Sequence, residues 1–261
     1  MSLRLTANPI EPLRSLALAM IRRFLLPFVP PAKYLDRPLA TWPPILGLVH
    51  DIRLPRRTPP QGPTGAANIN ILLEMIDRTA PIPGDLAECG VFRGASLVPM
   101  AVHLQKVAPD KHLFGFDSFA GYDQSILRDI AMGGPPEANK RVGGFGDTSC
   151  GLVLAKLQRF RVSNVTLIPG YFRHSLPQCA DRRFSFVHLD IGIYDNYKDC
   201  LEFFYPRLSP GGILLLNDYG KPNWPGCTQA VDGFLRATSE KLATIESGAY
   251  RKFYICKAER G

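Results

Sequence analysis

The chain has 261 residues, of which 46% are hydrophobic, and a formal net charge of +8. This length is enough for one substantial α/β core with an appendage, and the composition argues against disorder of the whole chain. Most of the charge lies near the N-terminus, where residues 1–60 carry nine Lys and Arg against three Asp and Glu. The remainder is nearly neutral, so a nucleic-acid-binding protein, which needs a basic surface, is not expected.

The six cysteines are widely spaced and form no C-x-x-C pair, which argues against a zinc ribbon and a redox dithiol. Several lie in apolar, strand-like runs, as buried free thiols do. This usage indicates a reducing, cytoplasmic location. No stretch of about 18 apolar residues occurs, so no membrane-spanning helix is expected.

Residues 1–63 contain 12 of the 24 prolines, which predicts an extended arm rather than an independent core. Within this arm, the apolar residues of segment 13–28 fall at helical spacing. We expect an amphipathic helix that packs on its own domain or on a sister subunit. The alternative is peripheral contact of residues 13–28 with a membrane surface through a basic face.

The main domain is expected over residues 64–261, where helix-like and strand-like segments alternate. Helices are predicted at 68–80, 94–108, 147–160, 195–208 and 227–238, and strands at 85–90, 112–117, 164–170, 184–190, 211–218 and 250–258. Residues 118–146 form a Gly/Pro-rich loop. Short apolar strands that alternate with helices predict a parallel sheet covered on both faces.

Acidic residues stand where several of these strands end: Glu88, Asp117, Asp190 and Asp218. In such sheets, ligands bind outside the carboxyl ends of the strands. Core packing does not explain acids aligned in this way. We therefore predict that this edge of the sheet forms the functional site.

The first strand and the helix after it predict a nucleoside pocket. Glu88 and Gly90 end the strand, and Gly94 and Ser96 begin the helix, whose free N–H groups can bind an anion. The spacing is not G-x-G-x-x-G, so the dinucleotide fingerprint is absent. Asp117, at the end of the next strand, can accept both ribose hydroxyls. These features favour S-adenosylmethionine over a dinucleotide as the ligand.

Several motifs occur in an order that resembles a known family. They are "GDLAECGVFRGASL", "FGFDSFAG", "GDTSCGLVLAKLQRF", "NVTLIPGYFRHSLP", "FVHLD", "YPRLSPGGILLLNDYG" and "WPGCTQAVDGFL". From about residue 64 to 256 the chain resembles the macrocin O-methyltransferase family, class I S-adenosylmethionine-dependent enzymes that methylate sugar hydroxyls of secondary metabolites. The resemblance implies a Rossmann-like, seven-stranded, mostly parallel sheet with an antiparallel last strand.

The resemblance also implies a cofactor site, with the "DTS" block near the adenine and the preceding loop acting as a lid. Together with the strand-end residues, the expected cofactor-binding set is Glu88, Cys89, Gly90, Gly94, Ser96, Asp117, Ser118, Asp147, Thr148, Ser149 and Asp190. Asp147, Thr148 and Ser149 can instead cap their own helix.

The family holds Mg²⁺ with a strand-end Asp, which matches Asp190, and an Asp-Asp pair, which matches Asn217 and Asp218. Asn217 removes one negative charge and is expected to weaken the metal site. The general base that the family places two residues after the first Asp is replaced by Gly192. Asp190 and Asp195 are the candidate catalytic residues, and the alternative role for Asp195 is an N-cap.

Other side chains give weaker signals. His50 and His174 are more simply structural or surface residues, and His188 is expected to be a hydrogen-bonded core residue. Tyr219 and Trp224 either form an apolar wall for the acceptor or pack in the core.

The sequence therefore predicts a methyltransferase that acts on a hydroxyl of a sugar or glycosylated metabolite. One alternative is a protein that binds S-adenosylmethionine but is catalytically impaired, or that serves as a partner subunit. The other is a membrane-associated enzyme that methylates a glycolipid. A homo-oligomer is expected from the resemblance alone.

Overall fold

The computed structural model describes residues 62–135, 137–248 and 250–258. The predicted amphipathic segment 13–28, His50 and nearly all of the proline-rich arm lie outside these ranges. Both the packing and the membrane-contact hypotheses for residues 13–28 therefore remain predictions.

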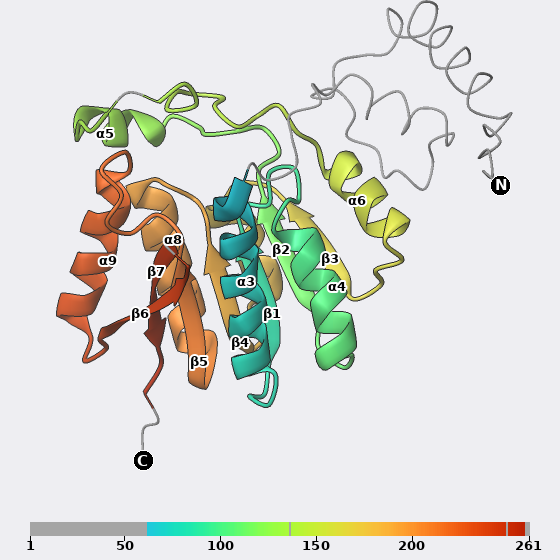
Figure 1. Ribbon diagram of the computed structural model, residues 1–261. Helices are drawn as coiled ribbons and strands as arrows, with labels where there is room; N and C mark the ends of the chain where they lie inside the picture. The colour runs from blue at the N-terminus through green and yellow to red at the C-terminus, as the bar shows by residue number, and fades with distance from the viewer. Residues whose placement is uncertain (1–61, 136, 249, 259–261) are drawn as a thin grey trace, which may run out of the picture.

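A seven-stranded sheet forms the centre of the domain, with strand order β3-β2-β1-β4-β5-β7-β6 (Figure 1). The strands are β1 (Asp85–Cys89), β2 (Leu113–Asp117), β3 (Val165–Pro169), β4 (Phe184–Leu189), β5 (Leu208–Leu216), β6 (Leu242–Ser247) and β7 (Tyr250–Cys256). The pairs among β1 to β5 are parallel, whereas β7 runs antiparallel to both β5 and β6. This arrangement confirms the predicted class I methyltransferase fold.

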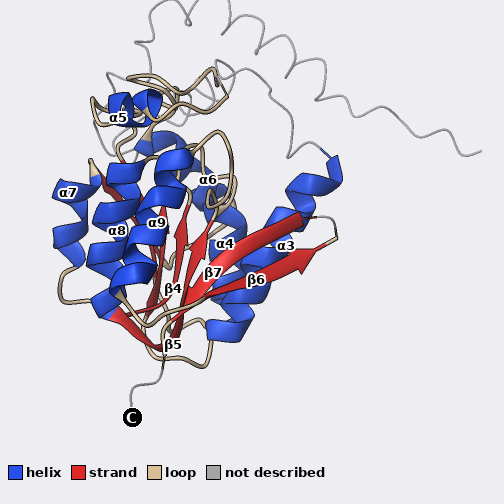
Figure 2. Cartoon of the chain, turned by 90° about the vertical axis from the view of Figure 1, so that its left-hand side faces the viewer, coloured by secondary structure: helices blue, strands red, loops and turns tan. Residues whose placement is uncertain are grey.

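Helices cover both faces of the sheet. They are α3 (Gly62–Thr79), α4 (Leu97–Val107), α5 (Ile126–Ala131), α6 (Cys150–Arg159), α7 (Phe172–Ser175), α8 (Tyr194–Arg207) and α9 (Pro225–Ala237), with a 3₁₀ turn η4 (Leu176–Cys179). The apolar residues of α3, α4 and α6 pack into one core, and those of α7, α8 and α9 into the other. Figure 2 shows α7 and α8 on one side of the sheet and α3 and α4 on the other.

The central strands are buried on both faces, which is why they read as apolar runs. All six residues of β4 are buried, including Ser185 and His188. Among the helices, α6 begins where the sequence predicted a cap, because Ser149 Oγ accepts a hydrogen bond from the Leu152 amide.

The carboxyl ends of the strands are held together by main-chain bonds beyond the regular ladder. Gly90 N donates to Phe116 O, Asp190 N to Cys89 O and Asn217 N to Leu189 O, each at 2.9 Å. Consequently the residues that follow β1, β4 and β5 lie at one fixed edge. Helix α5 lies above this edge (Figure 1).

Four elements differ from the sequence-based expectations. Helix α5 lies within the predicted loop, the short helices α7 and η4 lie in a segment with no predicted element, and β6 was not located, although a seventh strand was expected. None of the described helices has the length and apolar character needed to cross a membrane.

Candidate active site

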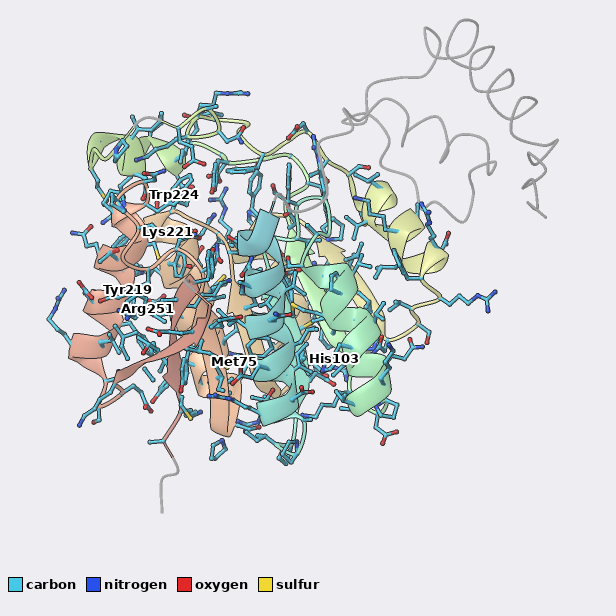
Figure 3. All side chains as sticks on the ribbon, in the orientation of Figure 1. Met75, His103, Tyr219, Lys221, Trp224 and Arg251 are labelled. Atoms are coloured by element: carbon cyan, nitrogen blue, oxygen red, sulfur yellow. The ribbon has the colours of Figure 1, made fainter. Side chains whose placement is uncertain are left out.

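A cavity of about 310 Å³ opens at the carboxyl ends of β1, β2, β4 and β5. Its lining comprises Gly90, Phe92, Asp117, Ser118, Gly121, Tyr122, Asp123, Glu137, Gly144, Phe145, Gly170, Tyr171, Phe172, Asp190, Ile191, Gly192, Asn196, Asn217, Asp218, Lys221 and Trp224. The edge of the sheet that the sequence predicted as the functional site therefore contains a cavity. Lys221 and Trp224 lie at the end of the sheet nearest α5 (Figure 3).

Gly90 forms part of the cavity floor, and the backbone there has no room for a side chain. Its φ is +90°, and a Cβ at this position would overlap the carbonyl oxygen of Asp190. Only glycine allows β1 and β4 to approach this closely while leaving the floor open to a ligand.

Asp117 organises the turn after β1. Its Oδ2 accepts a hydrogen bond from the Phe92 amide at 2.6 Å, and its Oδ1 accepts one from the Phe119 amide at 2.7 Å. Burial raises the pKa of Asp117, and these amide bonds oppose the rise. Phe92 and Phe119 both have positive φ, at 48° and 51°. Asp117 therefore fixes two strained residues while its carboxylate still lines the cavity.

Glu88 lies beneath the cavity and is not part of its lining. Its side chain is fully buried, and its Oε1 lies 2.9 Å from His188 Nδ1. Lys252 Nζ lies 3.4 Å from His188 Nε2, so Nε2 is the acceptor and Nδ1–H donates to Glu88. Burial raises the pKa of Glu88 to about 8 and lowers that of His188. The prediction that His188 is a hydrogen-bonded core residue is confirmed.

Aromatic rings form the roof of the cavity. The ring of Tyr122 meets those of Phe145 and Trp224 with centroids 5.8 and 5.9 Å apart. Phe145 also packs edge-on against Phe92 at 5.5 Å. Trp224 lines the cavity and also packs in the core, so its role as a wall for the acceptor stays a prediction. Tyr219 lies outside the cavity lining, and its hydroxyl donates a hydrogen bond to Asp232 at 2.8 Å.

At the acidic end of the cavity, two carboxylates, an amide and Lys221 line the wall, and Lys252 lies behind the amide. Asn217 Nδ2 donates to Asp190 Oδ1 at 2.5 Å and to Asp218 Oδ1 at 3.2 Å. Lys252 Nζ donates to Asn217 Oδ1 at 2.5 Å, and Lys221 Nζ donates to Asp218 Oδ1 at 3.2 Å. Burial, followed by the Asp218 charge, raises the pKa of Asp190 to about 6, and burial lowers that of Lys252 to about 8.

This donor set, as folded, does not suit Mg²⁺. The oxygen that Asn217 would offer to a metal already accepts a hydrogen bond from Lys252, and its NH₂ group faces the two carboxylates. Hard divalent cations need several free oxygen ligands. Within the described ranges, no group of three or more His, Cys, Asp or Glu side chains is placed to hold a metal ion.

The position of the family's general base is filled by neighbouring side chains. Gly192 has a φ of +67°, and a Cβ there would lie 2.7 Å from Tyr122 Oη and 2.9 Å from Trp224 Cε3. Its amide donates to Asp218 Oδ2 at 2.9 Å. Burial raises the pKa of Tyr122 well above its usual value, so this hydroxyl donates hydrogen bonds rather than taking up a proton.

Of the predicted cofactor residues, Gly90, Asp117, Ser118 and Asp190 line the cavity. The others lie around it. Glu88, Cys89, Gly94, Ser96, Asp147, Thr148 and Ser149 are outside its lining. Ser149 caps α6, and Thr148 Oγ1 donates to Phe92 O at 2.5 Å. Asp147 pairs with Arg93 at the surface. Their roles toward the cofactor remain predictions.

Asp195 is not the N-cap of α8 that the sequence suggested. The helix begins at Tyr194 after Ile193, and the Tyr194 amide is capped by Asp129 Oδ2 from α5 at 2.9 Å. Asp195 lies in the first turn and pairs with Arg128 at 3.2 Å, outside the cavity lining. The sequence prediction was wrong because a side chain distant in sequence provides the cap. His174 is likewise outside the lining.

Sequence reasoning missed Tyr122, Lys221 and Lys252 as members of the site. Tyr122 lies in the loop predicted as a lid, next to the glycine of "FAGY", which was its one signal. Lys252 lies in β7, and nothing in this strand-like run indicates that its side chain is buried, unlike that of its exposed neighbour Arg251.

Comparisons with known proteins place the chain in a family. Residues 59–250 match the family model of macrocin-O-methyltransferase (TylF). The chain is 30% identical over 141 residues to 8-demethyl-8-(2,3-dimethoxy-alpha-L-rhamnosyl)-tetracenomycin-C 4'-O-methyltransferase of Streptomyces olivaceus, covering 53% of this chain and 54% of that protein. It is 28% identical over 180 residues to mycinamicin III 3''-O-methyltransferase of Micromonospora griseorubida, covering 65% and 68%.

Among solved structures, the calicheamicin methyltransferase CalS11 aligns with a TM-score of 0.63 and 20% identity, covering 97% of this chain and 94% of that one. The O-methyltransferase NovP aligns with a TM-score of 0.59 and 23% identity, covering 74% and 80%. At these identities the structures show the fold. The family model matches most of the sequence, and the chain belongs to the macrocin O-methyltransferase family.

Proposed function

We propose that this chain transfers a methyl group from S-adenosylmethionine to a hydroxyl of a sugar or glycosylated metabolite. The observation that supports this proposal is that one cavity contains both Asp117, the last residue of β2, and Asp190, which follows β4, in a chain of this family. The named activities of the relatives, which are O-methyltransferases of glycosylated metabolites, support the choice of acceptor.

The floor around Gly90 and Asp117 is the end proposed to take the cofactor, with Asp117 accepting hydroxyls of the ribose. The acceptor is proposed to lie beside Asp190 and Lys221, beneath Trp224. An apolar wall with a few polar groups is typical of small-molecule sites.

In the proposed reaction, the acceptor oxygen forms a bond to the methyl carbon as the carbon–sulfur bond breaks. The products are a methyl ether and S-adenosylhomocysteine, and the hydroxyl proton passes to the Asp190 carboxylate. Asp190 is the proposed proton acceptor because it lines the cavity, whereas Asp195 does not and is paired with Arg128. Most of the rate is expected from alignment of the two reactants.

Asp190→Asn and the matched control Asp195→Asn test these roles. Calorimetry with S-adenosylmethionine should show binding to all three proteins, and methyl transfer from labelled cofactor should be measured on a panel of deoxysugar glycosides. Asp190→Asn is expected to lower kcat by about 10²-fold or more, and Asp195→Asn by no more than about threefold. Absence of cofactor binding to the unmodified protein would overturn the proposal, and equal losses in both variants would overturn the role of Asp190.

We also propose a cytoplasmic location and a homo-oligomer. The described cysteines, Cys89, Cys150, Cys179, Cys200, Cys227 and Cys256, are all free thiols, which supports a reducing compartment. The homo-oligomer rests on the family resemblance, and sedimentation velocity of the full chain tests it.

A further inference from the structure

We propose that the buried ammonium group of Lys252 is the resident cation of the cluster formed by Asp190, Asn217 and Asp218. In this chain the lysine takes the place of a divalent metal ion, and the site works without metal. The inference is about cation binding, and only its consequence for catalysis rests on the proposed function.

The sheet register places Lys252 at this position. Leu216 of β5 pairs with Phe253 of the antiparallel strand β7, so Asn217, the next residue, lies opposite Lys252. Lys252 is 3% exposed, and its Nζ donates to Asn217 Oδ1 at 2.5 Å and approaches His188 Nε2 at 3.4 Å. An ammonium buried this deeply is retained only when polar partners surround it.

The orientation of the Asn217 amide follows from its neighbours. With the oxygen toward Lys252 and the nitrogen toward Asp190 and Asp218, every contact joins a donor to an acceptor. The flipped amide would place its NH₂ against the ammonium and its oxygen against the Asp190 carboxylate, 2.5 Å away. The hydrogen-bond network therefore favours the orientation in which Asn217 directs its oxygen at Lys252 and not at a metal between the acids.

The formal charges of the cluster balance without a metal. Asp190 and Asp218 contribute two negative charges, and Lys252 and Lys221 contribute two positive charges. A divalent ion would add two further positive charges next to both ammonium groups, in a partly buried site where repulsion is weakly screened. Asp218 Oδ2 also accepts the Gly192 amide at 2.9 Å, which occupies another potential ligand.

Lys221 is the lysine of this cluster that can contact the acceptor. It lines the cavity, whereas Lys252 lies behind Asn217 and does not. The Lys221 ammonium has three donors, of which Asp218 takes one. Its remaining donors can bind an oxygen of the acceptor and orient it beside Asp190.

Manganese binding tests the inference without any methyl transfer. Free Mn²⁺ is measured by electron paramagnetic resonance during titration of the full chain, for the unmodified protein, for Lys252→Arg, and for the double variant Asn217→Asp with Lys252→Met. The unmodified protein and Lys252→Arg are expected to show no saturable site. The double variant, which has three carboxylates and no buried ammonium, is expected to gain one site per chain, at least about tenfold tighter than any binding to the unmodified protein.

A saturable Mn²⁺ site in the unmodified protein that disappears in Asp190→Asn would overturn the inference, whether or not the double variant folds. The inference would also be overturned if circular dichroism shows that the double variant is folded and the titration shows no Mn²⁺ site in it. Calorimetry with S-adenosylmethionine in EDTA keeps the two proposals apart, since absent cofactor binding contradicts the methyltransferase proposal while leaving the Mn²⁺ result intact.

Discussion

Gly192 and Tyr122 fit against each other so closely that no side chain fits at residue 192. A Cβ there would lie 2.7 Å from Tyr122 Oη, and real Cβ atoms essentially never approach a heavy atom within 3.0 Å. The aspartate that the family resemblance implies at this position would collide with Tyr122 as it lies here. The hydroxyl of Tyr122 occupies the space that an acidic side chain would need.

We expect Gly192→Ala to lower stability and acceptor turnover. The φ of +67° strains any side chain, and the added methyl group must also displace Tyr122 or Trp224. Gly248→Ala is the matched control, because its φ is +58° and no atom lies within 4 Å of the added Cβ. In urea unfolding, Gly192→Ala should lose about 1 kcal/mol or more beyond the control. Equal losses would show that the contact with Tyr122 is not tight.

We expect Asp117→Asn to weaken cofactor binding. One carboxylate oxygen becomes an NH₂ group that faces the amide of Phe92 or Phe119, so a buried hydrogen bond is replaced by two opposed donors. This costs about 1–3 kcal/mol and loosens the turn that lines the cavity. Calorimetry should show at least a tenfold loss of affinity for S-adenosylmethionine, about 1.4 kcal/mol. The exposed Asp110→Asn serves as control, and an unchanged affinity in Asp117→Asn would contradict the prediction.

Thr148→Val should affect stability rather than cofactor affinity. Thr148 is fully buried, lies outside the cavity lining, and its hydroxyl donates to Phe92 O. Valine has a similar shape but leaves this carbonyl oxygen unpaired, which costs about 1–3 kcal/mol. Chemical unfolding and calorimetry measure the two effects separately. A large loss of affinity with unchanged stability would instead assign Thr148 to the adenine, as the family resemblance implies.

Glu88 should make the protein less stable as the pH rises. Its pKa is about 8 in the folded chain against 4.5 for an unperturbed glutamate, so between these values the unfolded chain has released a proton that the folded chain still holds. The contribution of Glu88 to the free energy of unfolding is therefore fully present below about pH 4.5. It decreases as the pH rises toward 8, by roughly 1.4 kcal/mol for each unit by which the pKa is raised.

Glu88→Gln removes this titration. Relative to the unmodified protein, the variant should gain stability steadily between pH 5 and pH 8 in urea unfolding. The matched control is Glu202→Gln, an exposed glutamate on α8 whose side chain is 62% accessible. A difference between Glu88→Gln and the unmodified protein that stays constant with pH would contradict the prediction.

The fold was predictable because its central strands carry strong local signals. β1, β2 and β4 are buried apolar runs that end in or beside an acid, and each was located correctly. β6 was missed because it is an edge strand in which one residue of six is buried, so its pattern is weak. Helix α5 was missed because a long-range contact from Asp129 to the α8 amide of Tyr194 holds it within a Gly-rich loop.

Only those site residues that lie at the ends of strands could be predicted from the sequence. Gly90, Asp117 and Asp190 follow directly from the sheet topology, and all three line the cavity. Tyr122 and Lys252 depend on where a loop folds back and on the register of β7 against β5. Neither can be read from residues that are neighbours in sequence, because the partners lie 69 positions apart for Tyr122 and Ile191, and 35 for Lys252 and Asn217.

The floor and the roof of the cavity have different origins. Main-chain bonds and Gly90 fix the floor, whereas one continuous stretch between β2 and α6 supplies Tyr122 and Phe145 to the roof. Substitutions in this stretch would therefore reshape the roof, while the main-chain bonds that fix the floor would stay in place.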